Sequence, residues 1–291
     1  MTAGLQFIRS FLIGFSQIML QSNSLTGLCF LAAIAVNSLP MCLAAVAGSL
    51  TACLGAWVSG ADKAHLEQGL YGYNGALVGL ACALFWPSAS ALLMIILPIA
   101  ALLSAGLMRL FLEPRFSAWI GCPAYTAPFI LSIWLVTAVA EVEPAPGAAV
   151  THTGLDNLLL GFGQVLLLDN PIACLLILAG LALESRPALY WGAVAVVLSS
   201  GCAFLLGATP DVIFTGAYAY NAVLVAIALS VRPNLGALPL IAAILLSVPV
   251  TGWLKQSGVP VLTAPFVIVS WLALLLGRLD IVVGDQVPRS N

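Results

Sequence analysis

The chain contains two copies of one sequence unit, and this duplication constrains its fold more than any single residue does. The string Gly-Phe-small-Gln ends at Gln17 and again at Gln164, an offset of 147 residues (164 − 17 = 147). The dipeptide Tyr-Asn ends at Asn74 and at Asn221 with the same offset (221 − 74 = 147). A third string, Thr-Ala-Pro-Phe, recurs at an offset of 137 (263 − 126 = 137), so the second copy is ten residues shorter before that string (147 − 137 = 10).

The composition places both copies in a membrane. Hydrophobic residues make up 62% of the 291 residues and charged residues only 7%, whereas soluble domains carry about 25% charged residues. Between the short polar connections, the apolar runs are long enough to cross ~30 Å of hydrocarbon as helices. They lack the alternation of apolar and polar residues that membrane β-strands show. We therefore expect an all-α integral membrane protein in contact with membrane lipid.

The segment 141–147 is polar and helix-breaking, and its Pro-rich part 144–147 predicts a linker between a first repeat, 1–143, and a second repeat, 148–291. Each repeat contains six apolar runs, and the first run ends at a polar break at Asn23 or Asn170. Broken helices at corresponding positions of two halves are typical of transporter binding sites, which lie on the axis that relates the halves. We expect about five transmembrane helices and one re-entrant half-membrane pore helix per half. An odd number of spans would invert one half relative to the other around a central pore.

Gln17 and Gln164 are the first candidate site residues, because a glutamine amide offers both donors and an acceptor. Two such amides at equivalent places about a pore would suit a small neutral solute that donates and accepts hydrogen bonds. The alternative is an ordinary hydrogen bond between membrane helices.

Thr126 and Thr263 form a second pair, each two residues before a proline. Proline removes a backbone donor and leaves a carbonyl one turn earlier without its partner. The threonine hydroxyl could satisfy that carbonyl, or hydroxyl and carbonyl could both face the pore.

Tyrosine and leucine four residues apart form the third pair, since residues at this spacing share one face of a helix. Two such faces could form a flat apolar slot, or they could be ordinary packing surfaces between helices. The residues concerned are Tyr73 with Leu77 and Tyr220 with Leu224. We assign Asn74 and Asn221 to structural hydrogen bonds ahead of ligand contact.

Several function classes lack support in the sequence. Carboxylates such as Asp169 and Glu184 lie at connections, whereas ion-coupled transporters normally need an ionisable group within the membrane. The net charge is −2 with no basic run, which argues against nucleic acid as a partner. Metal-binding, nucleophile–base and phosphate-loop motifs are absent from the sequence. We expect no metal, no cofactor and no enzyme activity, and we expect the seven cysteines to be buried packing residues.

The paired segments together resemble the urea transporter family. The resemblance rests on Gly-Phe-x-Gln followed by Asn, on Tyr-Asn-x-x-Leu and on Thr-Ala-Pro-Phe, in the same order in both halves across residues 10–280. It implies two inverted halves and a homotrimer with one pore per subunit. In the family, urea passes in single file, with its N–H groups on a ladder of oxygens and its flat face between apolar side chains.

Carried over by position, the resemblance makes the glutamines the pore-helix amides and the threonines the centre of the filter. It implies slot walls at Leu20, Tyr73 and Leu77 and at Leu167, Tyr220 and Leu224, with Ile18 and Val165 beside the narrowest point. The chain departs from the family at Leu20 and Leu167, where phenylalanine is common, and at Ser24, where proline is common. The choice between urea and a close analogue therefore stays open.

The sequence thus predicts passive, channel-like permeation of urea. The fit is also physical, because oxygens can replace the water lost by urea donors and apolar walls exclude ions, whose desolvation is far more costly. The alternatives are a channel for another small neutral solute (a short amide, ammonia or water) and a membrane scaffold that transports nothing. The short chain favours a prokaryotic source, and hence a bacterial inner membrane.

Overall fold

The computed structural model describes residues 3–87, 91–143, 152–232 and 235–284. These residues are almost entirely helical and contain no strand, which confirms the all-α prediction for the described part of the chain. The predicted linker, 144–147, lies outside the described residues.

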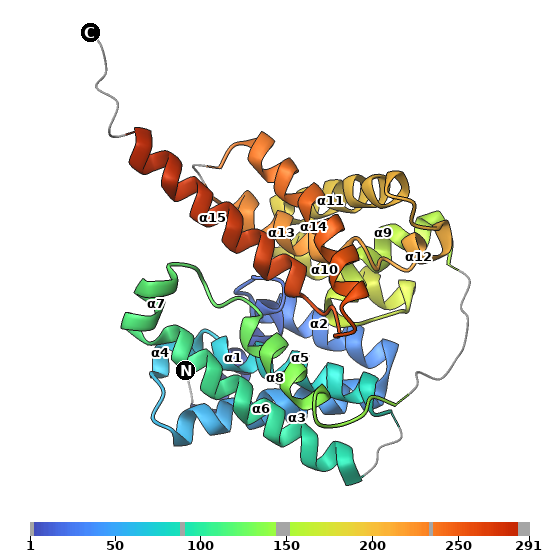
Figure 1. Cartoon of the computed structure of the whole chain (residues 1–291). Coiled ribbons are helices and arrows are strands. Elements are labelled where there is room, and N and C mark those ends of the chain that lie inside the picture. Colours follow the sequence, from blue (N-terminus) through green and yellow to red (C-terminus); the bar gives the residue numbers. More distant parts are fainter. Residues whose placement is uncertain (1–2, 88–90, 144–151, 233–234, 285–291) are drawn as a thin grey trace.

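Eight helices form the first half of the described chain, drawn in blue to green in Figure 1. Their bounds are α1 Ala3–Gln17, α2 Ser24–Asn37, α3 Leu39–Val58, α4 Lys63–Glu67, α5 Leu70–Phe85, α6 Ala91–Leu112, α7 Pro114–Ile120 and α8 Ala127–Thr137.

The second half, drawn in yellow to red, repeats this order from α9 onward, except that no helix corresponding to α7 lies among its described residues (Figure 1). Its helices are α9 Gly154–Gly163, the 3₁₀ turn η1 Gln164–Leu166, α10 Pro171–Glu184, α11 Arg186–Leu205, α12 Pro210–Phe214, α13 Tyr220–Ser230, α14 Ala237–Gln256 and α15 Ala264–Gly284.

Helix starts are fixed by the same residue types in both halves. The side chains of Asn23 and Asn170 accept hydrogen bonds from the first N–H groups of α2 and α10. Ser38 and Ser185 cap α3 and α11 in the same way, again 147 residues apart (185 − 38 = 147). These caps satisfy donors that a helix leaves open at its start, so the repeated sequence sets repeated helix boundaries.

The helices have the lengths and composition of a multi-pass membrane protein. Within the described ranges, α3, α6, α11 and α14 are each long and apolar enough to cross a membrane alone. The α9–η1 segment and α10 qualify only together and are bent by 75° at the break between them, as a broken or re-entrant segment would be. Several shorter apolar helices complete each half.

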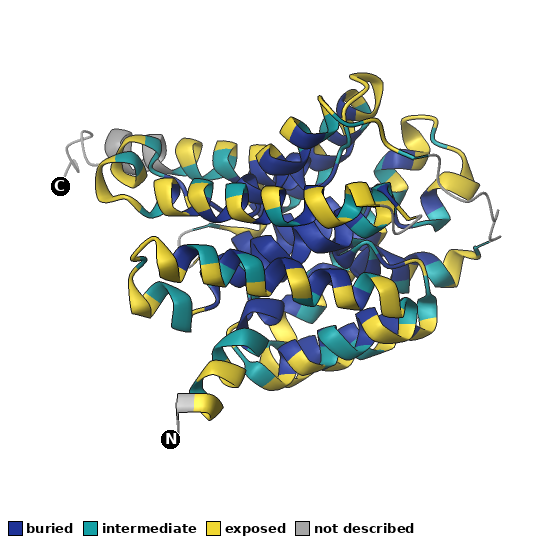
Figure 2. Ribbon diagram, turned by 90° about the horizontal axis from the view of Figure 1, so that it is seen from below, coloured by how far each residue is buried: buried dark blue, intermediate teal, exposed yellow. Residues whose placement is uncertain are grey.

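Burial follows the pattern of a protein dissolved in lipid. Figure 2 shows buried residues gathered in the middle of the molecule and exposed residues on the outward faces of the helices. Large apolar side chains lie on those outward faces, including Met94, which is 77% exposed, and Leu205, which is 85% exposed. An outer surface of this kind is stable in hydrocarbon and not in water.

The two halves join along α2 and α10, which pack against each other near the centre of Figure 1. The Thr26 hydroxyl donates to the Gly180 carbonyl at 2.9 Å across this contact. Asn37 Oδ1 accepts the backbone N–H groups of Asp169 and Asn170 at 3.1 and 3.0 Å. The break after the Gln164 motif is therefore held by the first half of the chain.

Candidate functional site

The first glutamine motif ends in a strained turn. Helix α1 ends at Gln17, and Leu20 then adopts the left-handed conformation with φ 60°. The Leu20 N–H bonds to the Gln17 carbonyl at 2.9 Å, and the Gln21 N–H bonds to the Ser16 carbonyl at 3.1 Å. This is the Schellman pattern of helix ends, with leucine where glycine is usual.

The second glutamine motif repeats the turn. Leu167 has φ 57°, and its N–H bonds to the Gln164 carbonyl at 3.1 Å. The Leu168 N–H reaches the Gly163 carbonyl at 3.1 Å. Two glutamines 147 residues apart therefore lie on equivalent turns (164 − 17 = 147).

Backbone strain among the described residues is confined to the repeated motifs. The non-glycine residues with positive φ are Leu20, Tyr125, Leu167 and Leu262, and the last two conformations match the first two across the halves. Each such residue costs about 1–3 kcal/mol and persists only where its surroundings enforce it. Strain of this kind gathers at functional sites, so it marks these four turns as the candidate site.

Tyrosine hydroxyls hold the strained carbonyls in place. The Tyr73 hydroxyl donates to the Tyr125 carbonyl, and the Tyr220 hydroxyl donates to the Leu262 carbonyl at 2.6 Å. The two tyrosines were predicted as slot walls, and the structure gives their hydroxyls this additional positioning contact.

The paired asparagines bind backbone, which confirms their assignment to structural hydrogen bonds. Asn74 Oδ1 accepts the Phe129 N–H at 3.0 Å, and Asn221 Oδ1 accepts the Phe266 N–H at 3.0 Å. These N–H groups lie in the first turns of α8 and α15, where no partner exists within the helix. Asn221 Nδ2 also donates to the Leu262 carbonyl at 3.2 Å.

Thr126 and Thr263 meet each other across the halves. The Thr263 hydroxyl donates to the Thr126 hydroxyl at 2.8 Å, and each residue is only 3% exposed. Pro128 lies in the first turn of α8, where a missing N–H leaves no carbonyl without its partner. The interpretation in which each threonine repairs a proline defect is therefore wrong here.

Two tryptophans form a reciprocal pair of contacts between the halves. Trp134 Nε1 donates to the Pro260 carbonyl at 2.8 Å, and Trp271 Nε1 donates to the Pro123 carbonyl at 2.8 Å. The two tryptophans are 137 residues apart, and so are the two prolines (271 − 134 = 137; 260 − 123 = 137). A contact from i to j matched by one from j to i is what a two-fold relation produces.

Burial separates the predicted site residues into two groups. Gln17, Leu20, Gln164 and Leu167 are partly exposed. The two threonines are buried, and the remaining six residues belong to one apolar core, against which Leu20 and Leu167 also pack: Ile18, Tyr73, Leu77, Val165, Tyr220 and Leu224. Accessible surface therefore remains at the glutamine turns, which include the predicted wall residues Leu20 and Leu167, and not at the other predicted slot walls.

Sequence reasoning missed the tryptophans and the strained carbonyls. Trp134 and Trp271 recur at the 137 offset, so a complete search for paired residues would have found them. Tyr125 and Leu262 share only their place before Thr-Ala-Pro-Phe, and no residue type signals a left-handed backbone there.

Gln17 lies at the wall of a cavity of about 410 Å³. Its Nε2 donates to the Ser22 hydroxyl at 3.2 Å, and both residues line the cavity with the polar side of α1. Gln164 makes no side-chain hydrogen bond to the residues that the structure describes. Three-residue clusters of His, Cys, Asp or Glu that could hold a metal are also absent from those residues.

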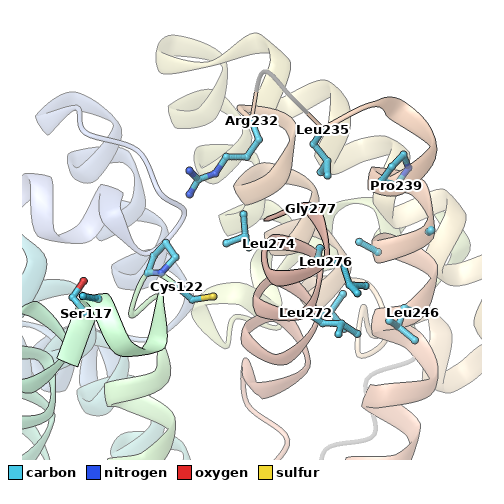
Figure 3. Close-up of a pocket in the computed structure, with 17 residues that line it drawn as sticks. Ser117, Cys122, Arg232, Leu235, Pro239, Leu246, Leu272, Leu274, Leu276 and Gly277 are labelled. Carbon is cyan, nitrogen blue, oxygen red and sulfur yellow. The ribbon is translucent and has the colours of Figure 1, made fainter. Parts of the chain in front are cut away.

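A larger cavity, of about 1100 Å³, lies elsewhere and contains none of the paired glutamines or threonines. Figure 3 shows Arg232 projecting toward the connection that carries Cys122, with Leu272 and Leu276 on α15 nearby. Much of its lining comes from outward-facing apolar positions such as these leucines, which are 43% and 51% exposed. Its lining also includes Pro123, whose carbonyl accepts the Trp271 bond, so the cavity adjoins the paired contacts between the halves.

Comparison with known proteins agrees with the motifs. The model of the urea transporter family matches residues 8–278. Urea transporter 1 of Rattus norvegicus is 26% identical over 243 residues, and Urea transporter 1 of Ovis aries is 27% identical over 244 residues. Each alignment covers 77% of this chain and 63% of the mammalian protein, so the chain spans less than two thirds of these relatives.

The match extends over both copies of the repeated unit and includes every motif on which the resemblance rested. The matched proteins are transporters, which confirms that the chain is not an enzyme. The chain is a multi-pass membrane protein and belongs to the urea transporter family.

Proposed function

We propose that the chain is a passive urea channel whose path runs between its two halves. The observation that carries this proposal is the hydrogen bond between Thr126 and Thr263, because two copies of one motif meet there, hydroxyl to hydroxyl. A residue that contacts its own counterpart lies at the axis that relates the two halves. This is where pores of duplicated membrane proteins form.

The proposed path begins at one glutamine turn and ends at the other. Gln17 and Gln164 offer an amide oxygen to urea donors and an amide N–H to its carbonyl. At the centre, urea would displace the bond between Thr126 and Thr263 and use both hydroxyls. Exchange of one set of hydrogen bonds for another keeps binding weak enough for release.

Apolar walls would complete the filter. Leu20 and Leu167 project from left-handed turns beside the glutamines, and Tyr73 and Tyr220 fix the carbonyls next to the threonines. Leu77 on α5 and Leu224 on α13, together with Ile18 and Val165, form the buried core around the two tyrosines. Walls of this kind exclude ions because the loss of ion hydration is not compensated.

The inverted arrangement of the halves, the homotrimer and the bacterial inner membrane belong to the same proposal. The reciprocal bonds of Trp134 and Trp271 support a two-fold relation between the halves. The trimer follows from the resemblance alone, and the relatives named above are mammalian. Native mass spectrometry of the detergent-solubilised chain tests the trimer.

Stopped-flow light scattering on proteoliposomes tests the function. We expect urea to enter vesicles that contain the chain at least about tenfold faster than empty vesicles, a difference of about 1.4 kcal/mol in the barrier. Collapse of ion gradients should not change this rate. A rate equal to that of empty vesicles, from verifiably folded protein, would refute urea conduction, and faster entry of acetamide or water alone would assign another neutral solute.

A further inference from the structure

The cavity beside Gln17 contains a carboxylate that the paired motifs do not explain. Glu67 ends the short helix α4 and lines the 410 Å³ cavity together with Gln17. Its counterpart in the second half is Phe214 (214 − 67 = 147). The carboxylate therefore belongs to only one of the two mouths, by which we mean the ends of the proposed path beside Gln17 and beside Gln164.

A polar stripe on α1 connects this cavity to the glutamine turn. The polar residues Gln6, Ser10 and Gln17 follow the helical spacing of one face, which they share with the apolar Ile13, and all four line the cavity. Eleven residues of helix separate the first from the last, a rise of roughly 16 Å. Polar side chains along one face of a helix in an otherwise apolar chain indicate contact with water and not with lipid.

Two contacts hold Glu67 over this stripe. Gln6 Nε2 donates to Glu67 Oε1 at 2.6 Å and ties α1 to α4. Gly69, with φ 72°, follows two residues later, and a Cβ there would lie 2.5 Å from the Gly14 nitrogen. The chain after Glu67 therefore passes against the α1 backbone at a distance that only glycine permits.

The carboxylate is available to a solute. The Glu67 side chain is 39% exposed, and Lys63, its ion-pair partner at 3.4 Å, is 82% exposed. An ion pair this open to water is weak and leaves the carboxylate able to accept further hydrogen bonds. Gln68 and Arg9 complete the polar rim of the cavity.

The second mouth is built differently. The stripe recurs on α9, but Asp156 is engaged with Thr153 in a capping box, and Asn157 Nδ2 donates to the Ser200 hydroxyl at 2.8 Å. Asp156 and Asn157 are the equivalents of Arg9 and Ser10 (156 − 9 = 147; 157 − 10 = 147), so these two bind neighbouring protein atoms, and Phe214 stands where the first half has Glu67.

We infer that Glu67, Gln6 and Gln68 form a capture site in which the carboxylate accepts N–H donors of urea before the solute reaches Gln17. A carboxylate accepts from two N–H groups at once, and such charge-assisted bonds are about twice as strong as neutral ones. This inference rests on the proposed function and assigns the Gln17 side as the mouth with the higher affinity for urea.

The test is the urea dependence of influx into proteoliposomes. We expect wild-type flux to saturate and Glu67→Ala to raise the half-saturating urea concentration about tenfold, the equivalent of about 1.4 kcal/mol, with little change in the maximal rate. Glu67→Gln keeps an acceptor for Gln6 and removes only the charge, so it should raise this concentration about threefold. Glu184→Gln, at an exposed carboxylate beyond this cavity at the end of α10, is the matched control and should match wild type.

Three results would overturn the capture site. A wild-type flux that rises linearly with urea means that no such site binds, although the channel itself then stands. Full rescue by Glu67→Gln of a defect in Glu67→Ala means that the residue only links α1 to α4. An equal effect of Glu184→Gln means that surface charge alone is responsible. If the wild-type chain shows no urea flux at all, the proposed function itself is refuted, and the capture site with it.

Discussion

The two halves of the molecule pack the same helices with different residues. In the first half, α3 and α5 meet at Gly48 and Gly79, where an added Cβ would lie 2.2 Å from the Gly75 carbonyl and 2.0 Å from the Ala44 carbonyl. In the second half, the corresponding positions on α11 and α13 are Ala195 and Ala226, and both are fully buried (195 − 48 = 147; 226 − 79 = 147).

The halves agree instead around the strained turns. The left-handed turns, the tyrosine–carbonyl bonds, the asparagine bonds and the Trp–Pro bonds all occur twice. Among the bonds between the halves, those of Thr126 with Thr263 and of the two tryptophans join equivalent positions, whereas those of Thr26 and Asn37 occur only once. The comparison therefore locates the shared site at the paired positions and allows the mouths and the outer packing to differ.

Glycine packing gives the largest expected difference between the halves. Gly79→Ala would place a methyl group against backbone, so α3 and α5 must separate, and we expect a loss of about 3 kcal/mol in stability. Ala226→Gly introduces no clash and should lower the free energy of unfolding by about 1 kcal/mol, because glycine has a lower helix propensity than alanine. Thermal unfolding of the solubilised protein, followed by tryptophan fluorescence, measures both, and equal effects would remove the packing difference.

The paired asparagines should come next, and they should differ in a defined direction. Asn74→Ala leaves the buried Phe129 N–H without its acceptor, which costs about 1–3 kcal/mol. Asn221→Ala loses the equivalent bond and also the bond to the Leu262 carbonyl, whereas the Asn74 amide donates to the Met108 sulfur, a weak acceptor, so the melting temperature should fall further in Asn221→Ala. A larger effect at Asn74 would contradict the bond assignment.

The threonine pair should show equal effects from the two halves. Thr126→Val and Thr263→Val each remove one of the two bonded hydroxyls, and each should slow urea influx about tenfold, a barrier increase of about 1.4 kcal/mol. Stopped-flow rates at matched protein density measure this. If only one variant slows flux, the two hydroxyls do not act as one centre.

The left-handed leucines should give the smallest change in stability. Leu20→Gly and Leu167→Gly relieve a conformation that costs about 1–2 kcal/mol per residue. The simultaneous loss of a partly buried side chain offsets this gain, so we expect each variant to stay within about 1 kcal/mol of wild type. A loss above about 3 kcal/mol in either half would show that the side chain is mainly a core residue.

Much of this architecture could be predicted from the sequence because the motifs occur twice. The repeated Asn and Ser caps, the glutamine motifs and the threonines all lie where the offsets of 147 and 137 place them. The all-helical fold followed from the length of the apolar runs.

The remaining features depend on contacts between distant parts of the chain. Nothing in the sequence around Thr126 says that its partner is Thr263 and not a nearby carbonyl. Glu67 looks like any charged residue of a surface connection, and only the fold places it above Gln17. The carbonyl of the left-handed Tyr125 is bonded to Tyr73, 52 residues away (125 − 73 = 52), and no local propensity reveals such a contact.

A reversible cross-link at the centre tests the account most directly. Thr126→Cys and Thr263→Cys would be combined in a chain whose seven native cysteines are replaced by alanine, since the two side chains are close enough for a disulfide. The account predicts that oxidation abolishes urea influx into proteoliposomes and that reduction restores it. The influx of each single cysteine variant should change under neither treatment. A cross-link that forms completely and leaves urea influx unchanged would contradict a path between the two halves.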